Sequence, residues 1–296
     1  MWGRLFDQAA GTARRDGTVT LPSGRRLGYA EYGDPSAPPA LYCHGFPSSR
    51  LEAGLVPVSD VRLIAIDRPG YGLSDPRPGR RLLDFARDVE CLADTLGLDR
   101  FALCGVSGGA PYAAACAYAL QDRVSSLALV SGIAPPGFGW EAGSAAGALM
   151  AMGRRPLAMK AIGFGMRHVV ERSDPQRTLK WLRRTAGFPP PAPGSLDAGE
   201  LILRGWQEGL RASMEGPLSD ARIYASPWGF LPEQIEVPTV VWHGTRDRTV
   251  PVAAGRLMAQ RIPRATAHIK EGESHFSLIW RHHRAILQSA LQVGRH

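Results

Sequence analysis

Hydrophobic residues in the first 131 positions form short apolar runs that alternate with turn residues and with helical patterns. Short apolar runs bounded by turns are typical of strands that lie buried in a sheet. These runs predict strands at residues 18–21, 26–31, 40–43, 62–66, 101–106 and 124–131. The turn Pro22-Ser23-Gly24 lies between the first two strands and predicts a hairpin.

Two helical patterns lie between these strands. Apolar residues recur at spacings of three and four from Leu82 to Leu96, and Gly97 follows, as at the C-terminal end of an amphipathic helix. Residues 108–120, which come directly after the strand at 101–106, predict a second helix. Strands that alternate with helices in this way predict a mostly parallel sheet with helices on both faces.

The alternation stops after Ser131, because residues 134–232 contain only helical patterns and loops. A helix, a stiff proline-rich linker and a second helix with one apolar side are predicted there at residues 175–184, 187–194 and 201–214. Strands and helices then alternate again at residues 238–243, 253–261, 266–270 and 277–292. The sequence therefore predicts an α/β core, residues 1–133 and 233–296, interrupted by a helical insertion, residues 134–232.

The composition is that of a globular protein and excludes disordered, collagenous and coiled-coil chains. Of the 296 residues, 44% are hydrophobic and 21% are charged. The 35 basic and 27 acidic residues give a net charge of +8, but the arginines are scattered and form no stripe with interleaved aromatic residues. We therefore expect a solvated basic surface and no nucleic-acid partner.

Cysteine usage and the N-terminus predict a cytoplasmic protein. The four cysteines show no C-x-x-C spacing and are interpreted as reduced, packed thiols. Residues 1–17 carry charges and no apolar run of seven, unlike a signal peptide. No stretch reaches 18 apolar residues, so we expect no contact with a membrane. Monomer and homodimer both stay open.

One motif carries chemistry and lies where a strand is predicted to meet a helix. Gly105-Val106-Ser107-Gly108-Gly109 fits the pattern G-x-S-x-G, with a strand before it and a helix of small residues after it. Glycines on both sides let the chain turn sharply and pack closely. Ser107 would then stand at the N-terminus of the helix, which favours negative charge. The context predicts a nucleophile rather than an ordinary Gly/Ser turn.

Taken together with four further segments, this motif resembles the α/β-hydrolase family over the chain from about residue 25 to the C-terminus. The five segments, in the family's order, are His44-Gly45-Phe46-Pro47, Asp67-Arg68-Pro69-Gly70-Tyr71-Gly72-Leu73-Ser74, Gly105–Gly109, residues 242–251 around Asp247, and Gly272-Glu273-Ser274-His275-Phe276. The resemblance implies a mostly parallel, twisted sheet flanked by helices, with the insertion serving as a helical cap over the nucleophile.

A serine nucleophile needs a base within hydrogen-bond reach and an acid that orients the base. His275 follows the strand at 266–270 by a short loop, so it can reach the same sheet edge as Ser107, and it matches the family's histidine. Asp247 comes four residues after the strand at 238–243 and matches the family's acid. Some relatives place the acid after the strand that follows the nucleophile helix, but residues 131–136 here hold no carboxylate.

The resemblance also implies an oxyanion hole made by the backbone N–H groups of Phe46 and Gly108. It gives His44 a mainly structural role, and we expect Asp67 and Arg68 to brace a loop. No dinucleotide-type glycine pattern follows the first strand and no His/Cys/Asp cluster has metal spacing, so we expect no cofactor and no metal.

These observations predict a serine hydrolase that cleaves a small carboxylic ester, or a related acyl compound, through an acyl-enzyme. Serine at position 107 argues against the dehalogenase and epoxide-hydrolase branches, which resemble this fold but use aspartate. Two alternatives stay open: an amide, peptide or carbon–carbon bond hydrolase with the same triad, and a small-molecule receptor that keeps the fold without turnover.

Overall fold

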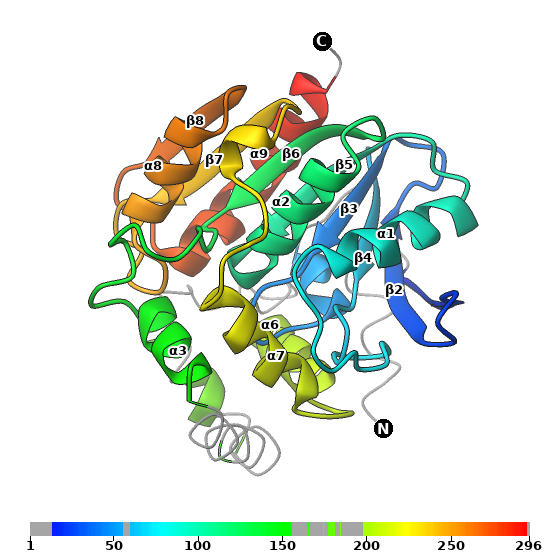
Figure 1. Cartoon of the computed structure of the whole chain (residues 1–296), viewed down its shortest axis with the longest axis horizontal. Helices are drawn as coiled ribbons and strands as arrows, with labels where there is room; N and C mark the ends of the chain where they lie inside the picture. The colour runs from blue at the N-terminus through cyan, green and yellow to red at the C-terminus, as the bar shows by residue number, and fades with distance from the viewer. Residues whose placement is uncertain are drawn as a thin grey trace.

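A computed structural model of the chain describes residues 14–55, 60–155, 165, 174, 177–180, 184 and 198–294. They contain one eight-stranded sheet with the strand order β1-β2-β4-β3-β5-β6-β7-β8 (Figure 1). The strands are β1 Arg15–Thr20, β2 Arg26–Gly33, β3 Pro39–Cys43, β4 Arg62–Ile66, β5 Phe101–Val106, β6 Val124–Val130, β7 Thr239–Gly244 and β8 Ala265–Lys270. β2 pairs antiparallel with β1 and β4, whereas all other neighbours are parallel. The predicted hairpin and mostly parallel sheet are confirmed.

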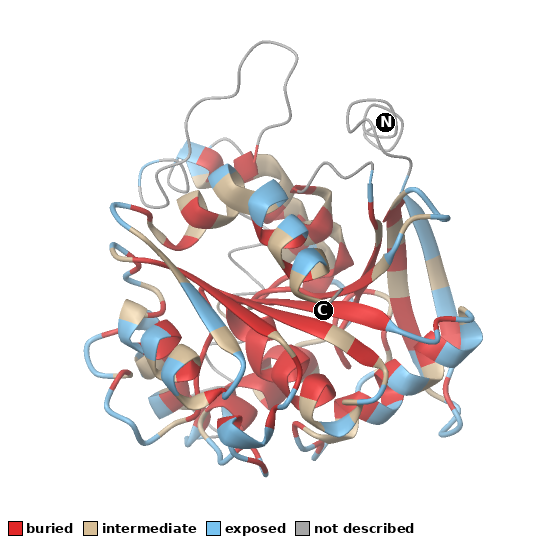
Figure 2. Cartoon of the chain, turned by 90° about the horizontal axis from the view of Figure 1, so that it is seen from above, coloured by how far each residue is buried: buried red, intermediate tan, exposed pale blue. Residues whose placement is uncertain are grey.

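Helices cover both faces of the sheet, so its central strands are buried on both sides. α1 (Asp84–Thr95), α2 (Ala110–Ala119) and α8 (Val252–Arg261) share one apolar core with one face. α9 (His275–Val293) packs on the other face, and α6 (Ala198–Gly209) contributes residues to the same apolar cluster. Figure 2 shows the buried strands between these layers. Consequently every residue of β5 and β7 is buried, which is why their sequences form continuous apolar runs.

The described residues between β6 and β7 form helices joined by turns and loops. They include α3 (Ala145–Gly153), α6, α7 (Glu215–Tyr224) and the short η3 (Pro232–Gln234), and they contain no strand. Of the predicted helix at 175–184, residues 177–180 and 184 are described and helical, whereas the linker at 187–194 lies outside the described residues. α3, α6 and α7 gather at one end of the sheet (Figure 1). Within the described part of the chain, no helix combines the length and the apolar character needed to cross a membrane.

Arg50 fastens α6 to the sheet. It lies at the start of η1 (Arg50–Leu55), and its guanidinium binds Asp16 of β1 at 2.9 Å, Asp67 at 3.0 Å and Glu208 of α6 at 2.7 Å. The helix also packs closely, since a Cβ at Gly209 would lie only 2.1 Å from the carbonyl oxygen of Ser48. Three parts of the chain that are distant in sequence therefore meet at one side chain.

Asp220 fastens α7 to the core in the same way. This fully buried carboxylate pairs with Arg68, at 2.7 Å, and with Arg80. It also accepts hydrogen bonds from the hydroxyls of Tyr71, Tyr112 and Tyr224. Burial by itself raises the pKa of Asp220, but the attraction of the two arginines and the hydrogen bonds outweigh it and lower the pKa. The carboxylate is therefore charged and its attachment to the core is ionic.

Candidate active site

Ser107 lies on a sharp turn between β5 and α2. Its φ is 52°, in the left-handed region that side chains other than glycine rarely adopt. The glycines of the motif permit this turn, because a Cβ at Gly105 would lie 2.7 Å from the Cβ of Ala113. A Cβ at Gly109 would lie 2.1 Å from the carbonyl oxygen of Cys43. The hydroxyl is thus held at the carboxyl edge of the sheet, at the start of a helix.

Asp247 lies in the loop after β7, which hydrogen bonds hold in place. Its Oδ1 accepts hydrogen bonds from the backbone N–H groups of Thr249 and Val250, each at 2.9 Å. The same loop is joined to the loop after β8, because the Arg246 N–H donates to the carbonyl oxygen of Glu273 at 2.9 Å. The loops that carry Asp247 and His275 are therefore held side by side.

His275 is the first residue of α9 and joins the other two predicted residues. Its Nδ1 lies 2.7 Å from Asp247 Oδ2, and its Nε2 lies 2.9 Å from Ser107 Oγ. Ser274 caps the helix by accepting a hydrogen bond from the N–H of Ser277, which fixes the start of α9 at His275. The structure thus brings Ser107, His275 and Asp247 into one hydrogen-bonded chain, and all three are more than nine-tenths buried.

The carboxyl group of Asp247 stays ionised in this environment. Burial raises its pKa, but the attraction of His275 and the hydrogen bonds from His243 and His275 outweigh burial and hold the pKa far below its usual value. An aspartate in this state accepts the Nδ1–H of His275, which leaves Nε2 free to accept the Ser107 proton. The order of groups is the one that base-assisted nucleophilic attack requires.

Phe46 and Gly108, the predicted oxyanion-hole residues, lie next to each other beside Ser107. A Cβ at Gly108 would lie 2.8 Å from the Cβ of Phe46, so the two backbones approach closely. The carbonyl of Gly108 points to α7, where the hydroxyl of Tyr224 donates to it at 2.8 Å. Phe46 also lines the pocket in front of Ser107.

His44, Asp67 and Arg68 are buried, and none of them lines the pocket. Burial and the neighbouring Arg68 hold the pKa of His44 well below its usual value, so the ring is neutral. Asp67 accepts hydrogen bonds from the backbone N–H groups of Arg50, at 2.7 Å, and Leu73, at 2.9 Å. These contacts fit the structural roles expected for the three residues.

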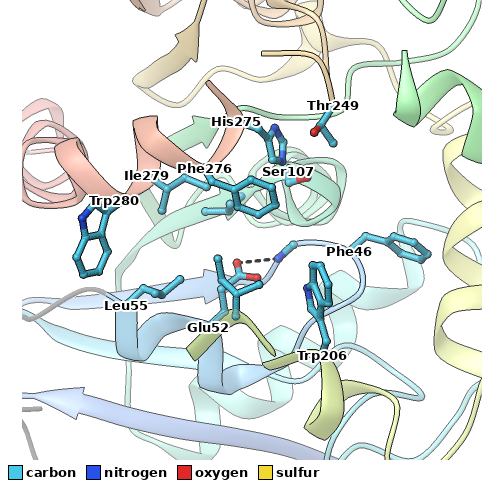
Figure 3. Close-up of a pocket in the computed structure, with 13 residues that line it drawn as sticks. Phe46, Glu52, Leu55, Ser107, Trp206, Thr249, His275, Phe276, Ile279 and Trp280 are labelled. Atoms are coloured by element: carbon cyan, nitrogen blue, oxygen red, sulfur yellow. Dashed lines mark hydrogen bonds between the residues drawn. The ribbon is translucent and has the colours of Figure 1, made fainter. Parts of the chain in front are cut away.

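A small apolar pocket opens in front of Ser107 and His275 (Figure 3). Its volume is about 60 Å³, whereas a single water needs at least about 10–15 Å³ by the same measure, so it has space for a few water-sized groups. Its other lining residues are Gly45, Phe46, Glu52, Leu55, Val106, Ile202, Trp206, Thr249, Phe276, Ile279 and Trp280. A pocket of this size and character fits a short apolar group.

Sequence reasoning missed two residues at this site. The Nε2 of His243 lies 3.4 Å from Asp247 Oδ2 and 2.9 Å from the carbonyl oxygen of Val250, so this buried ring supports the acid loop. Its position at the end of a strand, four residues before Asp247, was the available signal. Glu52 lines the pocket from η1, and only its proximity in sequence to Gly45 could have pointed to it.

The described residues contain no group of three or more His, Cys, Asp or Glu side chains arranged to hold a metal ion. They do contain a serine, a histidine and an aspartate that are joined by hydrogen bonds at the mouth of an apolar pocket.

Comparisons with known proteins agree with this fold. A family model described as "alpha/beta hydrolase fold" matches residues 38–282. A non-heme chloroperoxidase of Streptomyces lividans is 29% identical over 274 residues, which cover 88% of this chain and 92% of the relative.

Solved structures of similar fold include an esterase from Exiguobacterium antarcticum, with a TM-score of 0.66, 19% identity and coverage of 93% of this chain and 98% of the other. An enol-lactonase from Burkholderia xenovorans LB400 has a TM-score of 0.67 at 21% identity, covering 95% and 100%. At these identities the likeness shows the fold alone.

Proposed function

The chain belongs to the alpha/beta hydrolase family, and from this premise we propose that it is a serine hydrolase that cleaves small carboxylic esters. The observation that supports the proposal best is the pair of hydrogen bonds made by His275, 2.9 Å to Ser107 Oγ and 2.7 Å to Asp247 Oδ2. Both distances lie in the range from which a histidine can accept a serine proton while an aspartate orients it.

In the proposed reaction, Ser107 Oγ attacks the ester carbonyl carbon while His275 Nε2 takes the hydroxyl proton. Asp247 holds the ring orientation and stabilises the imidazolium. The N–H groups of Phe46 and Gly108 stabilise the oxyanion of the tetrahedral intermediate. His275 returns the proton to the departing alcohol, and a water activated by the same ring then hydrolyses the acyl group from Ser107.

The pocket supports an ester of short chain as the substrate, because its wall is mostly apolar and its volume is small. The two structural neighbours named above are an esterase and an enol-lactonase, and both names denote cleavage of an ester bond. We further propose that residues 134–232 form a cap. Ile202 and Trp206 of α6 supply part of the pocket wall, and Tyr224 of α7 contacts the peptide after Ser107.

A fluorophosphonate probe and p-nitrophenyl esters from acetate to decanoate test the proposal. We expect wild-type protein to be labelled at Ser107 and to hydrolyse the short esters, and Ser107→Ala to do neither. Weak labelling of the wild type together with unchanged ligand binding by Ser107→Ala would instead indicate a receptor. Labelling without hydrolysis of any ester in the series would refute the ester assignment and leave amide or carbon–carbon bonds.

A further inference from the structure

Glu52 places a carboxylate in the wall of the otherwise apolar pocket. The residue is half-buried, and it lines the cavity in front of Ser107. Among the described lining residues it is the sole carboxylate, and no lysine or arginine stands beside it in the wall. In Figure 3, Glu52 and Trp206 lie on the side of the pocket opposite Ser107 and His275. A substrate that enters the pocket therefore meets this group.

Two hydrogen bonds fix the orientation of the carboxylate, and the same oxygen accepts both. Oε1 accepts from the N–H of Gly45 at 2.9 Å and from the hydroxyl of Tyr42 at 2.9 Å. The backbone that carries Glu52 is fixed as well, because Arg50 anchors the start of η1 and α6 packs against it. The group is thus held rigidly rather than free to turn away from the pocket.

Oε2 is the carboxylate oxygen nearer to the space above Gly45, which also borders Ser107. A methyl-sized group placed on Gly45 would lie 3.3 Å from Glu52 Oε2 and 3.5 Å from the Cβ of Ser107. One atom above Gly45 therefore touches both side chains. A substrate carbonyl held at Ser107 brings its neighbouring atoms to this place.

The electrostatic environment makes this oxygen a strong acceptor. Burial raises the pKa of Glu52, while the hydrogen bonds to its carboxylate, first that from Gly45 N–H, and the attraction of Arg68 oppose that shift. A carboxylate in apolar surroundings gains most from a partner that brings a proton, and more from one that also brings positive charge. A methyl group at the same place would leave the carboxylate without that compensation.

We propose that Glu52 is a specificity-determining residue that accepts a hydrogen bond from a hydroxyl or ammonium group of the substrate, close to the scissile bond. The proposal rests on the proposed ester hydrolysis and names its substrate class more closely. The preferred esters carry a short apolar chain with one hydrogen-bond donor, and not a second carboxylate, which Glu52 would repel.

Three esters of equal shape test this preference on the acyl side: ethyl 3-hydroxybutyrate, ethyl 3-aminobutyrate and ethyl 3-methylbutyrate. On the alcohol side, 2-hydroxyethyl butyrate is compared with propyl butyrate. Hydrolysis is followed by pH-stat titration, which needs no chromogenic leaving group. On one of the two sides, we expect wild-type kcat/KM to favour a donor-bearing ester over its apolar isostere by about 10- to 100-fold. Comparing the hydroxyl-bearing ester with the amino ester then shows which of the two donors Glu52 prefers.

Glu52→Gln should reduce that preference at least tenfold, because the amide offers a weaker, uncharged acceptor. Tyr42→Phe is the matched control, since it removes a hydrogen bond to the same carboxylate but keeps the charge. It should retain the preference within about threefold. If Glu52 merely pinned the Gly45 backbone, both variants would slow all esters alike. That result, or the absence of any preference in the wild type, would overturn the proposal.

A separate measurement keeps this proposal distinct from the proposed function. If the wild type turns over none of these esters, ester hydrolysis is refuted, and binding then decides the role of Glu52. Calorimetric titration of the acyl-side esters into Ser107→Ala, with and without Glu52→Gln, should show tighter binding of a donor-bearing ester only where Glu52 is intact. Equal affinities in the two proteins would overturn the role of Glu52.

Discussion

Replacing Asp220 by asparagine tests whether the buried charges that attach α7 to the core stabilise the fold. The variant keeps the shape of the side chain but removes the negative charge that faces Arg68 and Arg80, all three being almost fully buried. Removing one partner of a buried ionic group costs about 3–5 kcal/mol, because the remaining charges stay desolvated. With a urea dependence of about 3 kcal/mol/M, the unfolding midpoint should fall by about 1 M or more.

Asp94→Asn is the matched control for this experiment. Asp94 pairs with Arg123 at 2.6 Å, but its side chain is 63% exposed, and such surface pairs contribute about 0–1 kcal/mol. Urea unfolding of both variants, followed by circular dichroism at pH 7, gives the comparison. If Asp220→Asn lowered the midpoint no more than Asp94→Asn does, the argument from buried charge would be refuted.

The stability difference between wild type and Asp220→Asn should also change with pH in a defined direction. The pKa of Asp220 is lowered in the folded protein, so its charge stabilises the fold above the unfolded-state pKa, about 3.9. That stability is lost as the pH falls through the folded-state pKa. The difference between wild type and Asp220→Asn should therefore be constant from pH 7 to 5 and shrink below about pH 4.

Three further predictions concern catalysis, packing and thiol reactivity. Asp247→Asn should lower kcat for p-nitrophenyl butyrate by about 10⁴-fold, and a loss below tenfold would contradict its orienting role. Gly109→Ala should cost about 1–3 kcal/mol in thermal unfolding, because its Cβ would lie 2.1 Å from the Cys43 carbonyl oxygen. Gly54→Ala, whose nearest atom would be 3.7 Å away, should stay within about 0.5 kcal/mol; equal losses would refute the steric argument. Iodoacetamide at pH 8 should modify only Cys91 in the native protein, since the other three thiols are buried and burial raises the pKa of Cys43 to about 12. Peptide mass spectrometry gives the pattern, with urea-unfolded protein as the fully modified reference.

Much of the fold was predictable because buried parallel strands leave a strong signal. The apolar run at 101–106 coincides with β5, whose residues are all buried. β6 was predicted to end at Ser131 but ends at Val130, since Ser131 has a φ of 46° and leaves the extended conformation. The placement of Ser107, Asp247 and His275 rests on the resemblance to the α/β-hydrolase family, together with the rule that carboxyl ends of parallel strands meet at the same sheet edge.

The charged networks were not predictable, because they depend on tertiary pairing. Arg68 was interpreted as a loop brace, but nothing along the chain indicates that its partner is Asp220, 152 positions later. Glu52 lies in a short 3-10 helix without helical periodicity, so its contact with the pocket depends on where Gly45 and α6 pack against it. Propensity and periodicity describe local structure, and neither reports which distant side chains meet.

The two helices that wall the pocket differ in one respect that matters for laboratory evolution. The first turns of α9 carry His275 and three pocket residues, Phe276, Ile279 and Trp280. Substitutions at these three positions can therefore tilt the imidazole, which changes turnover together with selectivity. Ile202 and Trp206 belong to α6, which carries none of the three hydrogen-bonded residues. Libraries built at these two α6 positions should therefore reshape substrate preference while leaving the chemical step largely intact.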